Sequence, residues 1–147
     1  MKIELLKAID EEFEMCPEAF GGPVKDDEIK QAENELQVTL PNDYKMFILK
    51  YGAGAVGEAI ILELREAEYV ATPSFVEQSL KHRESLPDGY EKFVVIGIDG
   101  SGNPIGFNFP GKEIMRFHYD TGDKEVIAKS FEEYLEKSLK EEINIQF

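Results

Sequence analysis

Few residues of this sequence have types and spacings that could carry chemistry, and the most suggestive of them are glycines. Gly100 and Gly102 follow an apolar stretch, as in the fingerprint that binds the pyrophosphate of a dinucleotide. That fingerprint needs a third glycine where Ile105 stands, and a helix N-terminus to face the phosphates. An alternating pattern typical of a strand follows instead. The sequence therefore predicts a hairpin turn at residues 99–104 rather than a nucleotide site.

The sequence supports neither a metal site nor an activated nucleophile. The two histidines, His82 and His118, lie far apart in the sequence, and no ligand spacing typical of a metal site accompanies them. Cys16 is the single cysteine, and its acidic neighbours Glu14 and Glu18 should raise the pKa of the thiol rather than activate it. We therefore expect a protein that is not an enzyme and that has no catalytic residue, metal or cofactor.

Acidic residues far outnumber basic ones in this chain. The 147 residues hold 30 Asp and Glu against 16 Lys and Arg, which gives a net charge of −14 at neutral pH. Such a chain offers no basic patch for phosphates, so direct binding of nucleic acid is disfavoured. No signal peptide and no apolar run long enough to span a membrane is evident, and one cysteine suits a reducing compartment. We expect a cytoplasmic protein that binds neither membranes nor nucleic acid.

Two acidic runs are candidates for a docking surface. One lies near the end of a predicted first helix, where negative charge opposes the helix dipole, and the other surrounds Arg65. The excess acids, which neither cap helices nor form favourable i→i+4 pairs, are Glu11, Glu12, Glu58, Glu63, Glu66 and Glu68. One interpretation is a solvated face that keeps the protein in solution. The other is a surface whose long-range field attracts a basic protein partner.

Helical periods dominate both ends of the chain. Apolar residues at helical spacing predict helices over residues 2–15, 26–36, 41–51, 72–86 and 130–139. In the first of these helices, Ile3, Leu6, Ile9 and Phe13 should form the buried stripe. The last helix begins with a capping box made by Ser130 and Glu133.

Strand periods occupy the middle of the chain. From residue 56 the period becomes two, which places Ile60, Leu62 and Leu64 on one face. Residues 93–98 are apolar on both faces, as in a central, covered strand. Alternation predicts further strands at 105–109, 115–119 and 126–127, joined by tight turns. We expect one α+β domain over residues 1–147, with an antiparallel meander sheet flanked by N-terminal helices and a C-terminal helix.

Three motifs follow one another in a recognisable order and context. They are Ile29-x3-Glu33-x2-Leu36-x3-Leu40-Pro41-x-Asp43-Tyr44-x2-Phe47-Ile48-x2-Tyr51-Gly52, then Val95-Ile96-Gly97-Ile98-Asp99-Gly100-Ser101-Gly102-Asn103, and finally Ile127-Ala128-x-Ser130-Phe131-x2-Tyr134-Leu135. Together they resemble the SUKH superfamily, which groups fungal cell-wall-synthesis regulators with many bacterial toxin-immunity proteins. The resemblance covers residues 26–139.

The resemblance implies a scaffold that binds proteins rather than an active site. For a small bacterial member it implies an immunity protein, or antitoxin, that neutralises a cognate toxin. An acidic chain would suit a basic, nuclease-type toxin. The alternative is a regulatory or adaptor module that binds an endogenous protein without inhibiting an enzyme, as the fungal members do. In either case we expect a protein partner that contacts the excess acids.

Overall fold

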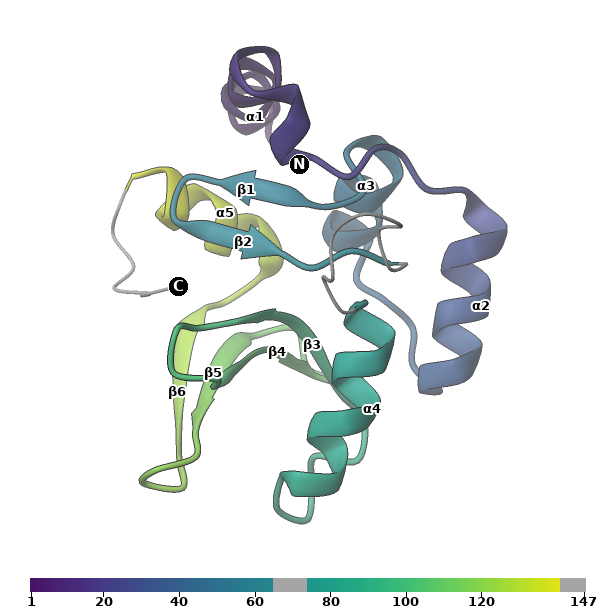
Figure 1. Cartoon of the computed structure of the whole chain (residues 1–147), viewed down its shortest axis with the longest axis vertical. Helices are drawn as coiled ribbons and strands as arrows, with labels where there is room; N and C mark the ends of the chain where they lie inside the picture. The colour runs from purple at the N-terminus through teal and green to yellow at the C-terminus, as the bar shows by residue number, and fades with distance from the viewer. Residues whose placement is uncertain (65–73, 141–147) are drawn as a thin grey trace.

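The computed structural model describes residues 1–64 and 74–140 of the chain (Figure 1). The elements of these residues, in chain order, are α1 (Ile3–Met15), η1 (Pro17–Ala19), α2 (Asp26–Leu36), α3 (Asn42–Lys50), β1 (Gly54–Val56), β2 (Ala59–Ile61), α4 (Phe75–Ser85), β3 (Phe93–Ile98), β4 (Pro104–Asn108), β5 (Ile114–His118), β6 (Asp123–Ala128) and α5 (Phe131–Leu139). The α+β class is therefore confirmed.

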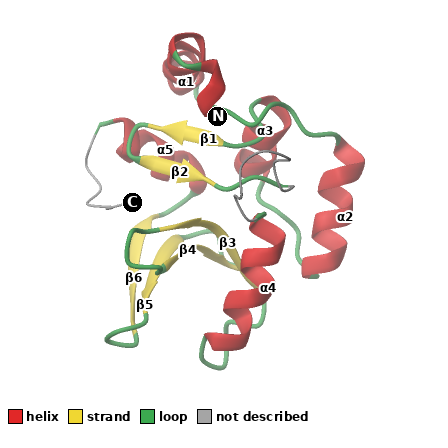
Figure 2. Ribbon diagram, in the orientation of Figure 1, coloured by secondary structure: helices red, strands yellow, loops and turns green. Residues whose placement is uncertain are grey.

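The strands β3 to β6 form an antiparallel sheet in which sequence neighbours are also neighbours in space. The predicted meander is thus confirmed, and Figure 2 shows its hairpins below the β1–β2 hairpin. The prediction that residues 93–98 form a central strand is wrong, because β3 lies at one end of this order. β3 is nevertheless covered, since α4 packs on it and the N–H of Leu62 donates to the carbonyl of Ile96 at 2.9 Å.

Aromatic rings from four elements meet in the core. Tyr44 of α3 packs edge-on against Phe75 of α4, Phe107 of β4 and Phe131 of α5, with ring centroids 5.0 to 6.3 Å apart. All four residues are almost completely buried. The apolar residues at helical spacing on α2 and α3 face this core, since Ile29, Ala32, Leu36, Phe47 and Ile48 are buried as well.

The buried face of α1 differs from the predicted stripe. Leu5 and Ile9 are buried, whereas Ile3 is 74% exposed and Phe13 is 37% exposed. Contacts with other helices determine this face, because Lys2 binds two glutamates of α5 and Asp10 pairs with Lys50 of α3. Apolar residues occur on both candidate stripes of this helix, so periodicity alone could not distinguish them.

The alternation after residue 56 does not continue as one strand. Val56 and Ala59 are paired across the turn of a short hairpin, β1–β2, and β2 ends at Ile61. Ile60 is 46% exposed while Leu62 is buried, so these two residues do not share an environment as their spacing suggested. Gly57 makes the turn possible, since its φ is +57° and an added Cβ would lie 2.3 Å from the carbonyl oxygen of Ser138.

Two helix caps fix where the later helices begin. Ser130 is the N-cap of α5 and its Oγ accepts the N–H of Glu133 at 3.1 Å, as predicted. α4 is capped by Ser74, whose Oγ accepts the N–H of Glu77 at 3.1 Å. The predicted start at Thr72 lies outside the described residues. No helix in the described part of the chain is both long enough and apolar enough to cross a membrane.

Candidate protein-binding site

The structure brings some of the excess acids predicted to dock a partner close together and places Glu63 elsewhere. Glu66 and Glu68 lie outside the described residues. Glu11 and Glu12 lie on α1, and Glu58 lies in the β1–β2 turn. The carboxylate of Glu12 accepts the N–H of Gly57 at 3.1 and 3.3 Å, which brings Glu12 next to the turn that carries Glu58. Glu12 therefore has a hydrogen bond to a distant backbone group. Such a partner is neither a helix cap nor an i→i+4 pair, so the sequence pattern did not predict it.

Glu58 and Glu63 are half-buried and occupy different parts of the surface. The N–H of Glu58 donates to the carbonyl of Ser138 at 3.4 Å, and its Oε2 is buried without a hydrogen-bond partner among the described residues. Glu63 lies against Gly21, where an added Cβ would be 3.2 Å from its Oε1. Of the described excess acids, only Glu11 is exposed, and the other three are half-buried.

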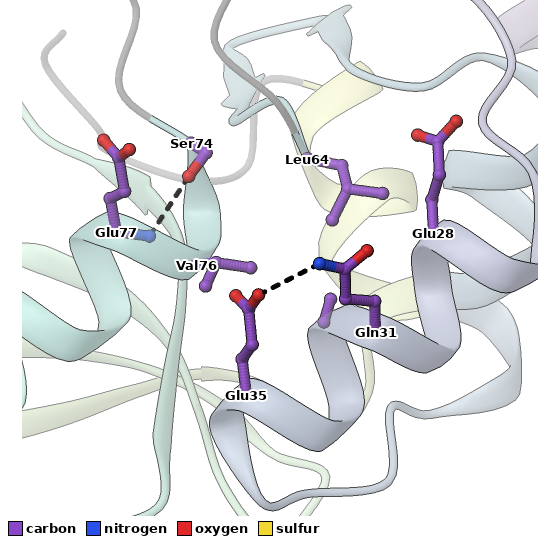
Figure 3. A pocket seen from close by; sticks show the side chains of 8 residues that line it. Glu28, Gln31, Glu35, Leu64, Ser74, Val76 and Glu77 are labelled. Carbon is purple, nitrogen blue, oxygen red and sulfur yellow. Dashed lines mark hydrogen bonds between the residues drawn. The ribbon is translucent and has the colours of Figure 1, made fainter.

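A groove with a volume of about 560 Å³ lies between α2 and α4 (Figure 3). Its lining comes from α2, from α4 and from the chain after β2. The lining residues are Glu28, Gln31, Ala32, Glu35, Leu64, Ser74, Val76 and Glu77. None of these residues was predicted as a site, although three of them are glutamates.

The helical repeat explains why α2 presents acids to this groove. Glu28, Gln31 and Glu35 follow one another at i, i+3 and i+7, so they lie on one face of the helix. Nε2 of Gln31 donates to Oε1 of Glu35 at 3.3 Å, and Figure 3 shows both side chains directed toward α4. Glu77 stands across the groove on the first turn of α4. The acid spacing on α2 was visible in the sequence, whereas the approach of α4 was not.

The base of the groove is apolar. Ala32 is 2% exposed and Val76 is 8% exposed, and the half-buried Leu64 lies near them. The charged side chains among the described residues that line the groove are those of Glu28, Glu35 and Glu77. Among the described lining residues, carboxylates thus surround an apolar floor.

The model of the SMI1/KNR4 family (SUKH-1) matches residues 23–137. The chain belongs to this family. The match includes α2, α4 and hence the groove, but it leaves out α1 with Glu11 and Glu12. The SUKH-1 family is associated with toxin immunity and is generally non-catalytic. No curated protein sequence matches the chain.

The glycine motif of this SUKH-1 domain organises a turn, as predicted. Oδ1 of Asp99 accepts the N–H groups of Ser101 at 2.9 Å and Asn103 at 2.8 Å. Its Oδ2 accepts Nδ2 of Asn103 at 3.1 Å and contacts Arg116 at 3.5 Å. These bonds close the β3–β4 hairpin. The hydrogen bonds of Asp99 therefore give residues 99–103, which belong to the second motif of the resemblance, a structural role in the turn.

His118 and Cys16 also have partners within the described part of the chain. His118 contacts Glu125 at 2.9 Å, and Arg116 contacts the same carboxylate at 2.8 Å. The hydrogen bond from His118, followed by that from Arg116, lowers the pKa of Glu125. Sγ of Cys16 donates to Glu18 at 3.1 Å, which raises the pKa of the thiol in the predicted direction. Among the described residues no group of three or more His, Cys, Asp and Glu could hold a metal.

Proposed function

We propose that this SUKH-1 domain is an immunity protein that binds a cognate toxin and neutralises it. The observation that carries the proposal is the family match over residues 23–137, because this family is associated with toxin immunity. Neutralisation needs only a surface that covers the toxin's site. No catalytic step is assigned to the chain itself.

The charge of the chain supports a basic, nuclease-type toxin as the partner. A nuclease must attract phosphates, so its active face is commonly positive. A chain with a net charge of −14 is attracted to such a face and competes there with nucleic acid. Electrostatic attraction of this kind raises the association rate more than it lowers the dissociation rate.

Glu11, Glu58 and Glu63, with Glu66 and Glu68, remain proposed docking residues. Glu11→Lys should lower the rate at which the chain associates with its partner. Glu113→Lys is the control, because it changes the net charge equally at an exposed position before β5, and it should lower that rate less. Glu12 contributes to docking indirectly, because its hydrogen bond to Gly57 fixes the β1–β2 turn that carries Glu58.

Capture from the native cell tests the proposal. The tagged chain is used to isolate its partner, and the activity of that partner is then assayed with and without added protein. We expect a toxin whose activity falls when the SUKH-1 domain is added. Capture of an endogenous protein that keeps its full activity would contradict the immunity role and indicate the adaptor role instead.

A further inference from the structure

A second hollow of the surface gathers lysines in a chain whose net charge is −14. It has a volume of about 560 Å³ and lies between α2, α3 and the residues that flank β3 and β4. Its lysines are Lys30 of α2, Lys45 of α3 and Lys92, which precedes β3. We call it the lysine hollow. The sequence contains no basic run here, because these lysines are far apart along the chain and only the fold brings them together.

Glu33, the acid among the described residues that line the lysine hollow, does not cancel its positive charge. Oε2 of Glu33 lies 3.2 Å from Nζ of Lys45 and also accepts the N–H of Leu40 at 2.8 Å. These contacts neutralise one lysine and leave the charges of Lys30 and Lys92 in the lining. An ammonium group has three N–H donors, so Lys45 can still donate to a second acceptor. The hollow is therefore a net positive site.

Lys92 is held beside an aromatic ring. Its Nζ lies 5.5 Å from the centroid of the Phe109 ring, which also lines the lysine hollow. The two backbones are joined as well, since the N–H of Phe109 donates to the carbonyl of Lys92 at 3.4 Å. A cation–π contact places an ammonium group without neutralising its charge. Lys92 is thus positioned in the hollow and keeps its charge for an anion.

The volume and the charge of the lysine hollow indicate the class of ligand. Sites for small molecules typically have volumes of about 300–1,000 Å³, and the hollow lies within that range. Lysine binds phosphate groups as a point charge. Because the lysines come from three segments, a ligand with several phosphate groups can contact more of them than a single phosphate can. Acids elsewhere on the chain repel such a ligand little at physiological ionic strength, where charges are screened beyond about 8 Å.

We propose that the lysine hollow binds a small molecule that carries two or more phosphate groups, held by Lys30, Lys45 and Lys92. The inference goes beyond the proposed function and does not depend on it. The described residues that line the hollow all lie within the residues that the SUKH-1 model matches. A ligand there bridges α2, α3 and the residues that flank β3 and β4, so its binding should stabilise the folded chain.

Titration calorimetry of the full chain with inorganic triphosphate tests the class of ligand. Measurements at physiological ionic strength compare triphosphate with inorganic phosphate and with sulfate. We expect a single triphosphate to bind each chain, at least about tenfold more tightly than either of the other anions. Equal affinities for the three anions, or no measurable binding of triphosphate, would overturn the proposal.

Charge-matched variants locate the bound triphosphate. Lys30→Gln/Lys92→Gln should weaken its binding by about tenfold or more, whereas Lys45 is kept because it forms an ion pair within the chain. The control Lys81→Gln/Lys124→Gln changes the net charge equally at exposed positions outside the lining of the hollow, and it should weaken binding little. Equal weakening by the two double variants would show that only overall charge matters, and would overturn the proposal. The single variant Lys92→Gln serves if the double variant does not fold.

The melting temperature gives an independent readout. A ligand that binds only the folded state stabilises it, so saturating triphosphate should raise the melting temperature of the wild-type chain. At the same concentration the rise should be smaller for Lys30→Gln/Lys92→Gln and close to that of wild type for Lys81→Gln/Lys124→Gln. No rise in wild type, or an equal rise in all three proteins, would overturn the proposal.

Discussion

Glu12 and Gly57 are joined across 45 positions of the chain, where both carboxylate oxygens of Glu12 accept the N–H of Gly57. The next residue, Glu58, donates its own N–H to Ser138 of α5. α1 is thus fastened through the β1–β2 turn to the C-terminal helix. α1 lies outside the SUKH-1 match, yet its residues Leu5 and Ile9 are buried in the core.

Glu12→Ala should therefore lower stability more than Glu11→Ala. Loss of the hydrogen bond to Gly57 should reduce the free energy of unfolding by about 1 kcal/mol. Glu11 is exposed, so its replacement should change that free energy by less than about 0.5 kcal/mol. Urea titration of both variants measures the difference. Equal stabilities would show that the Glu12 contact contributes nothing.

Phe47→Ala should be among the most damaging single changes. The Phe47 ring is fully buried and lies 5.2 Å from the ring of Tyr51 and 5.6 Å from that of Phe131. Removing it should cost about 3–5 kcal/mol of unfolding free energy. Its neighbour Met46 is 44% exposed, so Met46→Ala is the control and should cost little. A loss below about 1 kcal/mol at Phe47 would contradict its role in the core.

The cap of α5 should contribute measurably to stability. Ser130→Ala removes the acceptor for the N–H of Glu133 and should cost about 1 kcal/mol. Ser130→Asp keeps an acceptor at this position, so it should retain most of the stability. Thermal unfolding compares the two variants. Similar melting temperatures for Ser130→Ala and wild type would mean that the cap is not needed.

Glu125 should make stability depend on pH in the acid range. Hydrogen bonds from His118 and Arg116 hold its pKa below the ordinary value of 4.5. The charged form is thus favoured by folding, so this stabilisation is present above pH 4.5 and is lost as the pH falls through the lowered value. The side chain is half exposed, so solvent screening keeps the effect small.

Glu125→Gln tests this assignment by urea titration over a pH series. The variant should be less stable than wild type near neutral pH, and the difference should shrink as the pH falls below 4.5. Glu113→Gln, at an exposed position before β5, is the control and should show no such trend. A difference at Glu125 that stays constant with pH would contradict the assignment.

Local patterns predicted most of the fold. The capping box at Ser130, the helical stripe through Phe47 and the turn at Asp99 depend on residues close in sequence, and the structure confirms all three. The meander followed because each strand pairs with its sequence neighbour. The prediction was wrong where contacts between residues distant in the sequence determine which side chains are buried. On α1 the buried residue is Leu5, whereas the predicted one was Ile3.

The candidate site was less accessible to sequence reasoning. The predicted acids were selected by lacking local partners, but the partner of Glu12 is a distant backbone group. The groove needs α2 and α4 to lie side by side, which no local pattern indicates. The heptad spacing of Glu28 and Glu35 was present in the sequence. It did not predict a groove, because the opposite side is formed by Val76 and Glu77 of α4.

The most direct test of the immunity proposal is a titration of the captured partner's toxic activity with the purified SUKH-1 domain. If the partner is a nuclease, cleavage of a nucleic-acid substrate is followed while the domain is added. The account predicts that activity falls linearly and ends near one domain per toxin, with weaker inhibition at high salt. A partner that binds the domain yet keeps full activity when saturated would contradict it.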